Sequence, residues 1–182
     1  MTKQEQHQAD FLANEGKSLY RAKKYLPAAE SFSQAAAEYD ASGDTLLGAE
    51  MRNNQCVSLL LAKKPRQAIE AVQGTSALFI GAGEITQAGM ALANEATGLQ
   101  DLGEKESAIE LFTQAAELFQ SVDEGDLYLQ TMQSVSGLKL KSRKLVGAIF
   151  SMQKGLDGVE KPTWRQKLFK NLLKIFDNLL NK

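Results

Sequence analysis

The chain of 182 residues contains one cysteine, one histidine and three prolines. A single cysteine cannot form an internal disulfide, and His7 with Cys56 would be too few ligands for a metal site. The polar start of the chain lacks the features of a secretory signal, and no run approaches the ~18 apolar residues that a membrane span needs. We therefore expect a cytoplasmic protein without a membrane span, a metal or a cofactor.

Groups that could carry out catalysis are also scarce. Acidic residues are numerous but scattered over expected helix faces, and Cys56 stands at a packing position where we expect a buried, inert thiol. The run Gly81-Ala82-Gly83 follows an expected helix and lacks the later glycine and lysine of a phosphate loop. The aromatic residues do not interleave with a basic stripe, which argues against nucleic-acid binding. The sequence predicts no enzyme.

A period of 40 residues dominates the chain, and it runs through Ala28, Ala68, Ala108 and Ala148. Twelve positions before each alanine stands a small residue, and four positions after it stands a large apolar one. The small residues are Gly16, Cys56, Ala96 and Ser136, and the large ones are Phe32, Val72, Phe112 and Met152. Small residues at matched sites let two helices approach closely. A fixed period of this length is typical of a solenoid built from stacked helix pairs.

The expected helices form four pairs, and no useful stretch alternates with the period of a strand. The pairs are 7–22 with 25–40, 44–62 with 65–80, 84–102 with 105–121, and 126–142 with 145–157. Glycine followed by an acidic residue marks the junctions at Gly43-Asp44, Gly83-Glu84 and Gly125-Asp126. We expect one domain over residues 1–160, with repeats at about 6–42, 43–82, 83–123 and 124–160, followed by a separate helix over 161–182.

The chain resembles the tetratricopeptide repeat superfamily in its alternation of small and large packing residues. The pattern in repeat one is Leu12, Gly16, Leu19, Ala28, Phe32 and Ala35, and in repeat three it is Leu92, Ala96, Leu99, Ala108, Phe112 and Ala115. Repeat two departs at Arg52 and Thr75, and repeat four at Lys139 and Gly155. The long period is similar to that of the SNAP-type vesicle-fusion adaptors and the GoLoco-binding LGN scaffolds. The resemblance covers about residues 6–160, and it implies an all-α, right-handed helical solenoid that serves as a protein-interaction scaffold.

A second series at the same period bears on binding, and it consists of Asn14, Asn54, Asn94 and Ser134. By resemblance, the first helix of each pair lines the concave groove of the superhelix. A carboxamide there can donate to and accept from a peptide backbone, so we predict that an extended protein segment binds along this series. Lys17 and Arg21 stand near Asn14, and relatives that clamp a C-terminal tail suggest that they hold a carboxylate. The alternative is that the asparagines bond only to neighbouring helices.

Charge divides unevenly along the chain. Residues 1–138 carry 10 Lys and Arg against 19 Asp and Glu, whereas residues 139–182 carry 11 against 3. The segment 162–182 reads as an amphipathic helix whose polar side includes Lys167, Lys170 and Lys174. We expect this helix to cap the last repeat. The alternative is a SNAP-like peripheral membrane adaptor that contacts anionic lipid or an acidic partner through this basic region. The oligomeric state stays open.

Overall fold

The computed structural model describes residues 3–139 together with Trp164, Lys167, Leu168 and Asn171. Its contacts divide the chain into two units, residues 1–136 and 137–182, and the account below concerns the first. Three of the expected segments lie wholly or partly outside the described residues. They are the helix 145–157, the end of the helix 126–142, and most of 162–182.

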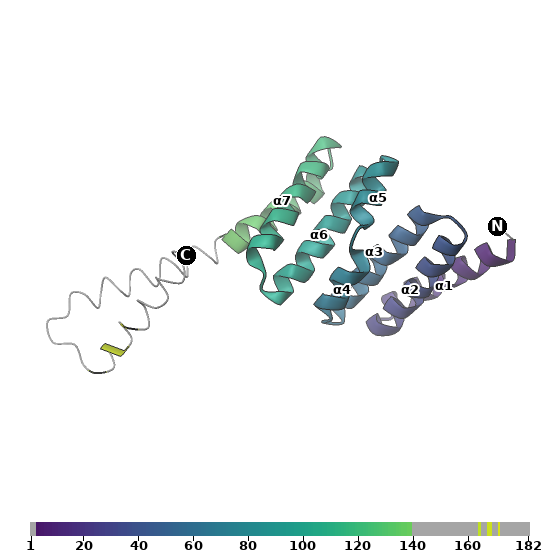
Figure 1. The fold of residues 1–182 in the computed structure, drawn as a ribbon, viewed down its shortest axis with the longest axis horizontal. Coiled ribbons are helices and arrows are strands. Elements are labelled where there is room, and N and C mark those ends of the chain that lie inside the picture. The colour runs from purple at the N-terminus through teal and green to yellow at the C-terminus, as the bar shows by residue number, and fades with distance from the viewer. Residues whose placement is uncertain (1–2, 140–163, 165–166, 169–170, 172–182) are drawn as a thin grey trace. The chain divides into compact units, whose positions relative to one another are not determined.

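Seven helices succeed one another in the first unit, and residues 125–139 are helical as well. The helices are α1 (Lys3–Arg21), α2 (Tyr25–Ala41), α3 (Thr45–Leu61), α4 (Pro65–Val72), α5 (Thr75–Ala82), α6 (Ile85–Leu102) and α7 (Lys105–Ser121). They run up and down side by side, so that turns fall at two opposite edges (Figure 1). No strand occurs among the described residues. The predicted all-α solenoid of helix pairs is confirmed over this part of the chain.

The predicted single helix over 65–80 is wrong, because the chain breaks it into α4 and α5. Gly74 adopts a left-handed conformation with φ of 81° and separates the two short helices. The Thr75 hydroxyl then donates to the Val72 carbonyl at 2.7 Å, which satisfies an acceptor at the end of α4. Thr75 is 1% exposed. Thr75, which departs from the repeat pattern, therefore stands at the first residue of α5.

The small residues of the register bring the helices close together. Ala28, Ala68 and Ala108 are fully buried, as are Cys56 and Ala96. Two glycines show how little room is left. A Cβ atom added to Gly16 would lie 2.8 Å from the Phe32 ring, and one added to Gly98 would lie 2.6 Å from the Ile69 side chain. Contacts this short exclude any larger residue without a shift of the neighbour. The large residues of the register fill the core beside these approaches.

Polar side chains add links between helices of the first two pairs. The Tyr39 hydroxyl donates to the Asp10 carboxylate at 2.7 Å, which ties α2 to α1. Burial, followed by this hydrogen bond, raises the pKa of Tyr39 well above its usual range. Arg52 pairs with Asp40 and joins α3 to α2. The arginine that departs from the repeat pattern therefore forms a salt bridge between the two pairs.

We expect Phe112→Ala to lower the free energy of unfolding by about 3 to 5 kcal/mol, because it leaves a cavity where a ring is 5% exposed. The matched control is Phe11→Ala, since Phe11 is 60% exposed on α1. Equilibrium denaturation with urea measures both changes. A loss below about 1 kcal/mol for Phe112→Ala would show that the packing register is misread.

Two glycines of the second pair should respond in opposite directions to alanine. Gly74→Ala should destabilise the fold, by roughly 1 kcal/mol, because alanine resists the left-handed conformation at this break. Gly81→Ala should stabilise it by about 0.5 to 1 kcal/mol, because Gly81 lies inside α5 with open space where the Cβ would stand. Thermal and urea denaturation of the two variants test the helix break. Equal effects of the two substitutions would contradict it.

Candidate binding face

Three hollows follow one another along the face formed by the first helices of the pairs, which we call the first-helix face. The first hollow has a volume of about 300 Å³, the second about 310 Å³ and the third about 260 Å³. The first is lined from α1, α2 and α3, the second from α3, α5 and α6, and the third from α6, α7 and the helical residues 127–134. The hollows therefore track the repeat, one for each junction between neighbouring pairs.

The predicted series of asparagines runs through these hollows. Asn54 lines both the first and the second, and Asn94 lines both the second and the third. Ser134 lines the third, where its hydroxyl donates weakly, at 3.4 Å, to the Gln130 carbonyl. Asn14 is exposed on α1 and lines none of the three. Two of the four predicted positions thus stand at the boundaries between successive hollows.

Asn94 differs from Asn54 in its hydrogen bonds. The Asn94 side-chain amide donates to the Asn53 oxygen at 2.9 Å, so it links α6 to α3. Asn53 is 8% exposed, and it does not belong to the 40-residue series. The alternative that the asparagines bond to neighbouring helices is therefore seen at Asn94. Asn54 makes no side-chain hydrogen bond in the part of the chain that the structure describes, and its carboxamide is available to a ligand.

Lys17 and Arg21 lie one helical turn apart and both line the first hollow, together with Tyr20. Both cations are exposed, and among the described residues neither forms an ion pair. The second hollow contains Glu50 instead of a cation. The charge along the first-helix face therefore changes from basic at the first hollow to acidic at the second. The predicted carboxylate site stays a prediction, and the equivalent positions of the second and third repeats hold Val57, Leu61, Thr97 and Asp101 in place of cations.

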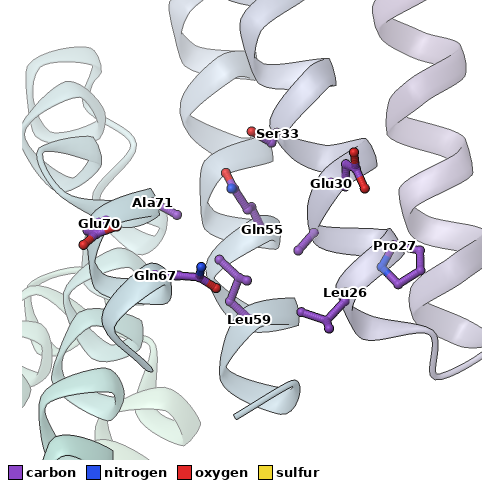
Figure 2. A pocket seen from close by; sticks show the side chains of 10 residues that line it. Leu26, Pro27, Glu30, Ser33, Gln55, Leu59, Gln67, Glu70 and Ala71 are labelled. Atoms are coloured by element: carbon purple, nitrogen blue, oxygen red, sulfur yellow. The ribbon is translucent and has the colours of Figure 1, made fainter. Parts of the chain in front are cut away.

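A larger hollow, of about 740 Å³, lies on the other side of α3 and was not predicted from the sequence. It opens between α2 and α4, with side chains of α3 at its floor (Figure 2). Its lining consists of Leu26, Pro27, Ala29, Glu30, Ser33, Gln55, Leu59, Gln67, Glu70 and Ala71. Close packing of Ile69 on Gly98 holds α4 against α6.

The titratable groups do not assemble a reactive centre in the described residues. Burial, and secondarily the charge of Glu95, raises the pKa of the Cys56 thiol to about 12. The thiol is therefore protonated near neutral pH and is a poor nucleophile. His7 is exposed at the start of the chain. The described residues contain no group of three or more His, Cys, Asp or Glu that could hold a metal ion.

The basic C-terminal residues are described only in part. Lys167 is helical and exposed, whereas Lys170 and Lys174 lie outside the described residues. None of the described helices is long and apolar enough to cross a bilayer. The capping of the last repeat by 162–182 therefore stays a prediction, and so does the alternative contact with anionic lipid or an acidic partner.

Stacked helix pairs with a 40-residue register and a row of hollows define a helical-repeat protein of the tetratricopeptide type. The family model described as "Soluble NSF attachment protein, SNAP" matches residues 2–154, and the chain belongs to this family. The predicted resemblance to SNAP-type repeats is thereby confirmed, and the family is one of helical adaptors for protein interaction. Among curated proteins, none matches the sequence.

Glu95 gives the fold a pH dependence that can be measured. It is half-buried on α6, and this burial raises its pKa above the ordinary value of 4.5. Because the folded state then holds this proton more tightly than the unfolded state, the contribution of Glu95 to stability is greatest below pH 4.5 and is lost as the pH rises through the raised pKa. We therefore expect Glu95→Gln to stabilise the protein at pH 7 and to have little effect at pH 4.

Urea denaturation at the two pH values measures this difference. The control is Glu110→Gln, which changes an exposed glutamate of α7 and should alter stability little at either pH. A Glu95→Gln variant that is less stable than the parent at pH 7 would contradict the assignment, since it would mean that the charged form is favoured in the fold.

Proposed function

We propose that this protein is a non-catalytic, cytoplasmic adaptor that binds an extended segment of another protein along its first-helix face. The observation that carries the proposal is the placement of Asn54 and Asn94, each of which lines two consecutive hollows. An extended chain passing from one hollow to the next crosses these two side chains. A carboxamide can satisfy both an N–H and a C=O group of that chain, and this supports binding without a strict sequence requirement.

The hollows differ in chemistry, and the differences suggest a direction for the bound segment. Lys17 and Arg21 favour a carboxylate at the first hollow, either of an acidic side chain or of a chain terminus. The third hollow includes Phe112 and Phe119 and favours an apolar side chain. We infer a ligand with an acidic group at one end and an apolar residue about two hollows away. Because the family name records attachment to NSF, an NSF-type protein is the first partner to test.

The second candidate function is that of a peripheral membrane adaptor that uses the basic C-terminal region. It is supported by the charge of residues 139–182 and by the helical, exposed Lys167. Lys167, Lys170 and Lys174 would then face anionic lipid or an acidic protein. We also retain as proposals the repeat bounds, the domain limit at residue 160 and the capping role of 161–182.

The test of the first candidate compares two carboxamides of α3. We expect Asn54→Ala to weaken binding of the partner segment by about 0.5 to 1.5 kcal/mol, or roughly twofold to twelvefold in Kd. Gln55→Ala is the matched control, because Gln55 lines the hollow on the other side of α3. The segment is mapped first by capture with the wild-type protein, beginning with NSF, and its affinity is then measured by calorimetry.

The melting temperature of both variants is measured alongside the affinity. An Asn54→Ala variant that binds normally but melts at a lower temperature would show that Asn54 supports the fold and not the ligand. Equal weakening by both substitutions would move the ligand away from the first-helix face.

A further inference from the structure

The hollow of about 740 Å³ between α2 and α4 has apolar residues of the core at its base, and we call it the second-helix hollow. Ala29 and Leu59 line it, are 4% and 6% exposed, and belong to one buried cluster. Leu26, the second residue of α2, also lines it and is 51% exposed. The hollow therefore offers apolar surface on a closely packed base.

A glutamate stands on each wall of the second-helix hollow. Glu30 belongs to α2 and Glu70 to α4, and both side chains line the hollow (Figure 2). Both are exposed, and in the described part of the chain neither forms an ion pair or a side-chain hydrogen bond. No lysine or arginine belongs to the lining. The hollow is therefore negative, and no cation of its own lining offsets the two carboxylates.

These two glutamates belong to a series at the 40-residue period. Glu30, Glu70 and Glu110 each stand two positions after a fully buried alanine of the packing register. Two positions along a helix correspond to a rotation of about 200°, so the glutamates point away from the core that the alanines face. All three are exposed. The spacing thus puts one carboxylate on the solvent side of the second helix of each of the first three pairs.

The second helices of the pairs are acidic apart from their first residues. α2 contains three acidic residues and no basic one, and α7 contains three acidic residues with Lys105 at its first position. Arg66 is the second residue of α4 and does not line the second-helix hollow. The first hollow of the first-helix face contains Lys17 and Arg21 instead. The two hollows, on opposite sides of α3, therefore favour ligands of opposite charge.

Two carboxamides add hydrogen-bonding groups to the second-helix hollow. Gln55 comes from α3 and Gln67 from α4, and Figure 2 shows both in the opening between α2 and α4. Among the described residues, neither side chain forms a hydrogen bond. A carboxamide can donate to a C=O group and accept from an N–H group of a bound segment. The hollow can therefore hold a ligand through polar groups as well as through charge.

We propose that the second-helix hollow binds a basic amphipathic segment of a partner protein, in which lysine or arginine stands on either side of an apolar residue. The cations lie beside Glu30 and Glu70, and the apolar residue packs on Leu26 and Leu59. The volume of about 740 Å³ lies in the range of roughly 300–1,000 Å³ that ligand pockets have. A nucleic acid does not fit, because the two carboxylates repel its phosphates.

Binding at this hollow leaves the first-helix face accessible, since Asn54 and Gln55 line hollows on opposite sides of α3. One molecule could then hold two segments of different chemistry at the same time. The second-helix hollow does not depend on the proposed function of the first-helix face, and it would extend an adaptor from one partner to two.

The experiment measures binding of a synthetic peptide to the full chain by fluorescence anisotropy. The probe is an amphipathic, helix-forming peptide with leucine on one side and lysine on the other, and a matched peptide has glutamate in place of every lysine. The hollow variant carries Glu30→Lys and Glu70→Lys, and the control variant carries Glu110→Lys and Glu117→Lys. The two variants change the net charge equally, and the control residues are exposed on α7, outside the lining.

We expect the wild-type protein to bind the lysine peptide and to lose affinity as salt is raised, because exposed charges are screened over about 8 Å at physiological ionic strength. The hollow variant should bind this peptide at least about tenfold more weakly than the control variant, because two attractions become repulsions. It should also gain affinity for the glutamate peptide. Circular dichroism melting checks folding. If the hollow variant melts early, Glu30→Gln with Glu70→Gln should lose about twofold to thirtyfold.

An uncharged pair of variants tests the apolar part of the hollow. Leu26→Ser should weaken binding of the lysine peptide by about threefold to tenfold, because the apolar contact at the start of α2 is lost. Leu46→Ser is the matched control, since Leu46 is the second residue of α3, is 39% exposed and does not line the hollow. Equal effects of the two substitutions would contradict a peptide seated in this hollow.

Three further results would overturn the proposal. A wild-type protein that does not bind the lysine peptide at low salt has no such site. Equal loss in the hollow and control variants would show that only net charge matters. A wild-type protein that sediments as a dimer, with a monomeric hollow variant, would assign the hollow to a second copy of the chain. Asn54→Ala should leave binding of the lysine peptide unchanged, so failure here is distinguishable from failure of the first-helix face.

Discussion

The close approach of neighbouring helices at small residues is the constraint on which the first unit depends. Where Gly16 meets Phe32 and Gly98 meets Ile69, a single added Cβ would stand within 2.8 Å of the neighbouring side chain. Such contacts set the distance between helices, and the distance sets how far each pair is offset from the next. The hollows on the first-helix face are the spaces left between helices at these offsets. Packing therefore determines the spacing of the binding face as well as the stability of the core.

Much of the fold could be predicted because the repeat register is a pattern of side-chain size. The observed bounds of α2, α3, α6 and α7 lie within one residue of the predicted ones, and α1 begins four residues earlier. The break at Gly74 could not be predicted. A glycine inside a helix costs only about 1 kcal/mol, so a periodic stretch with one glycine is still expected to be a single helix. The deciding feature is the left-handed φ together with the buried Thr75 hydroxyl, and both depend on the surrounding packing.

The candidate site, like the fold, could be predicted only in part. Asn54, Asn94 and Ser134, which the 40-residue spacing groups together, all line hollows of one face, because equal spacing puts residues at equivalent positions of successive pairs. The spacing could not distinguish Asn94, which bonds to Asn53, from Asn54, which does not. Alanine stands at the positions equivalent to Asn53 in the first and third repeats, 13 and 93, so this hydrogen bond between the second and third pairs depends on a residue outside the repeat pattern. A repeat pattern predicts positions, whereas the hydrogen bonds at each position depend on residues outside the pattern.

The charge of this protein is divided in one way along the sequence and in another way across the folded first unit. Counted along the sequence, basic residues belong to the C-terminal end and acidic residues to the rest. In the folded first unit, the turns alternate between two edges, so residues about 20 positions apart lie at opposite edges and residues 40 apart lie together. Lys23 and Lys63 are therefore neighbours along one edge, and the intervening acidic residue Asp44 stands at the other. A solenoid turns an alternation along the chain into a separation across the molecule, and interaction surfaces in such a protein are found by comparing equivalent turns.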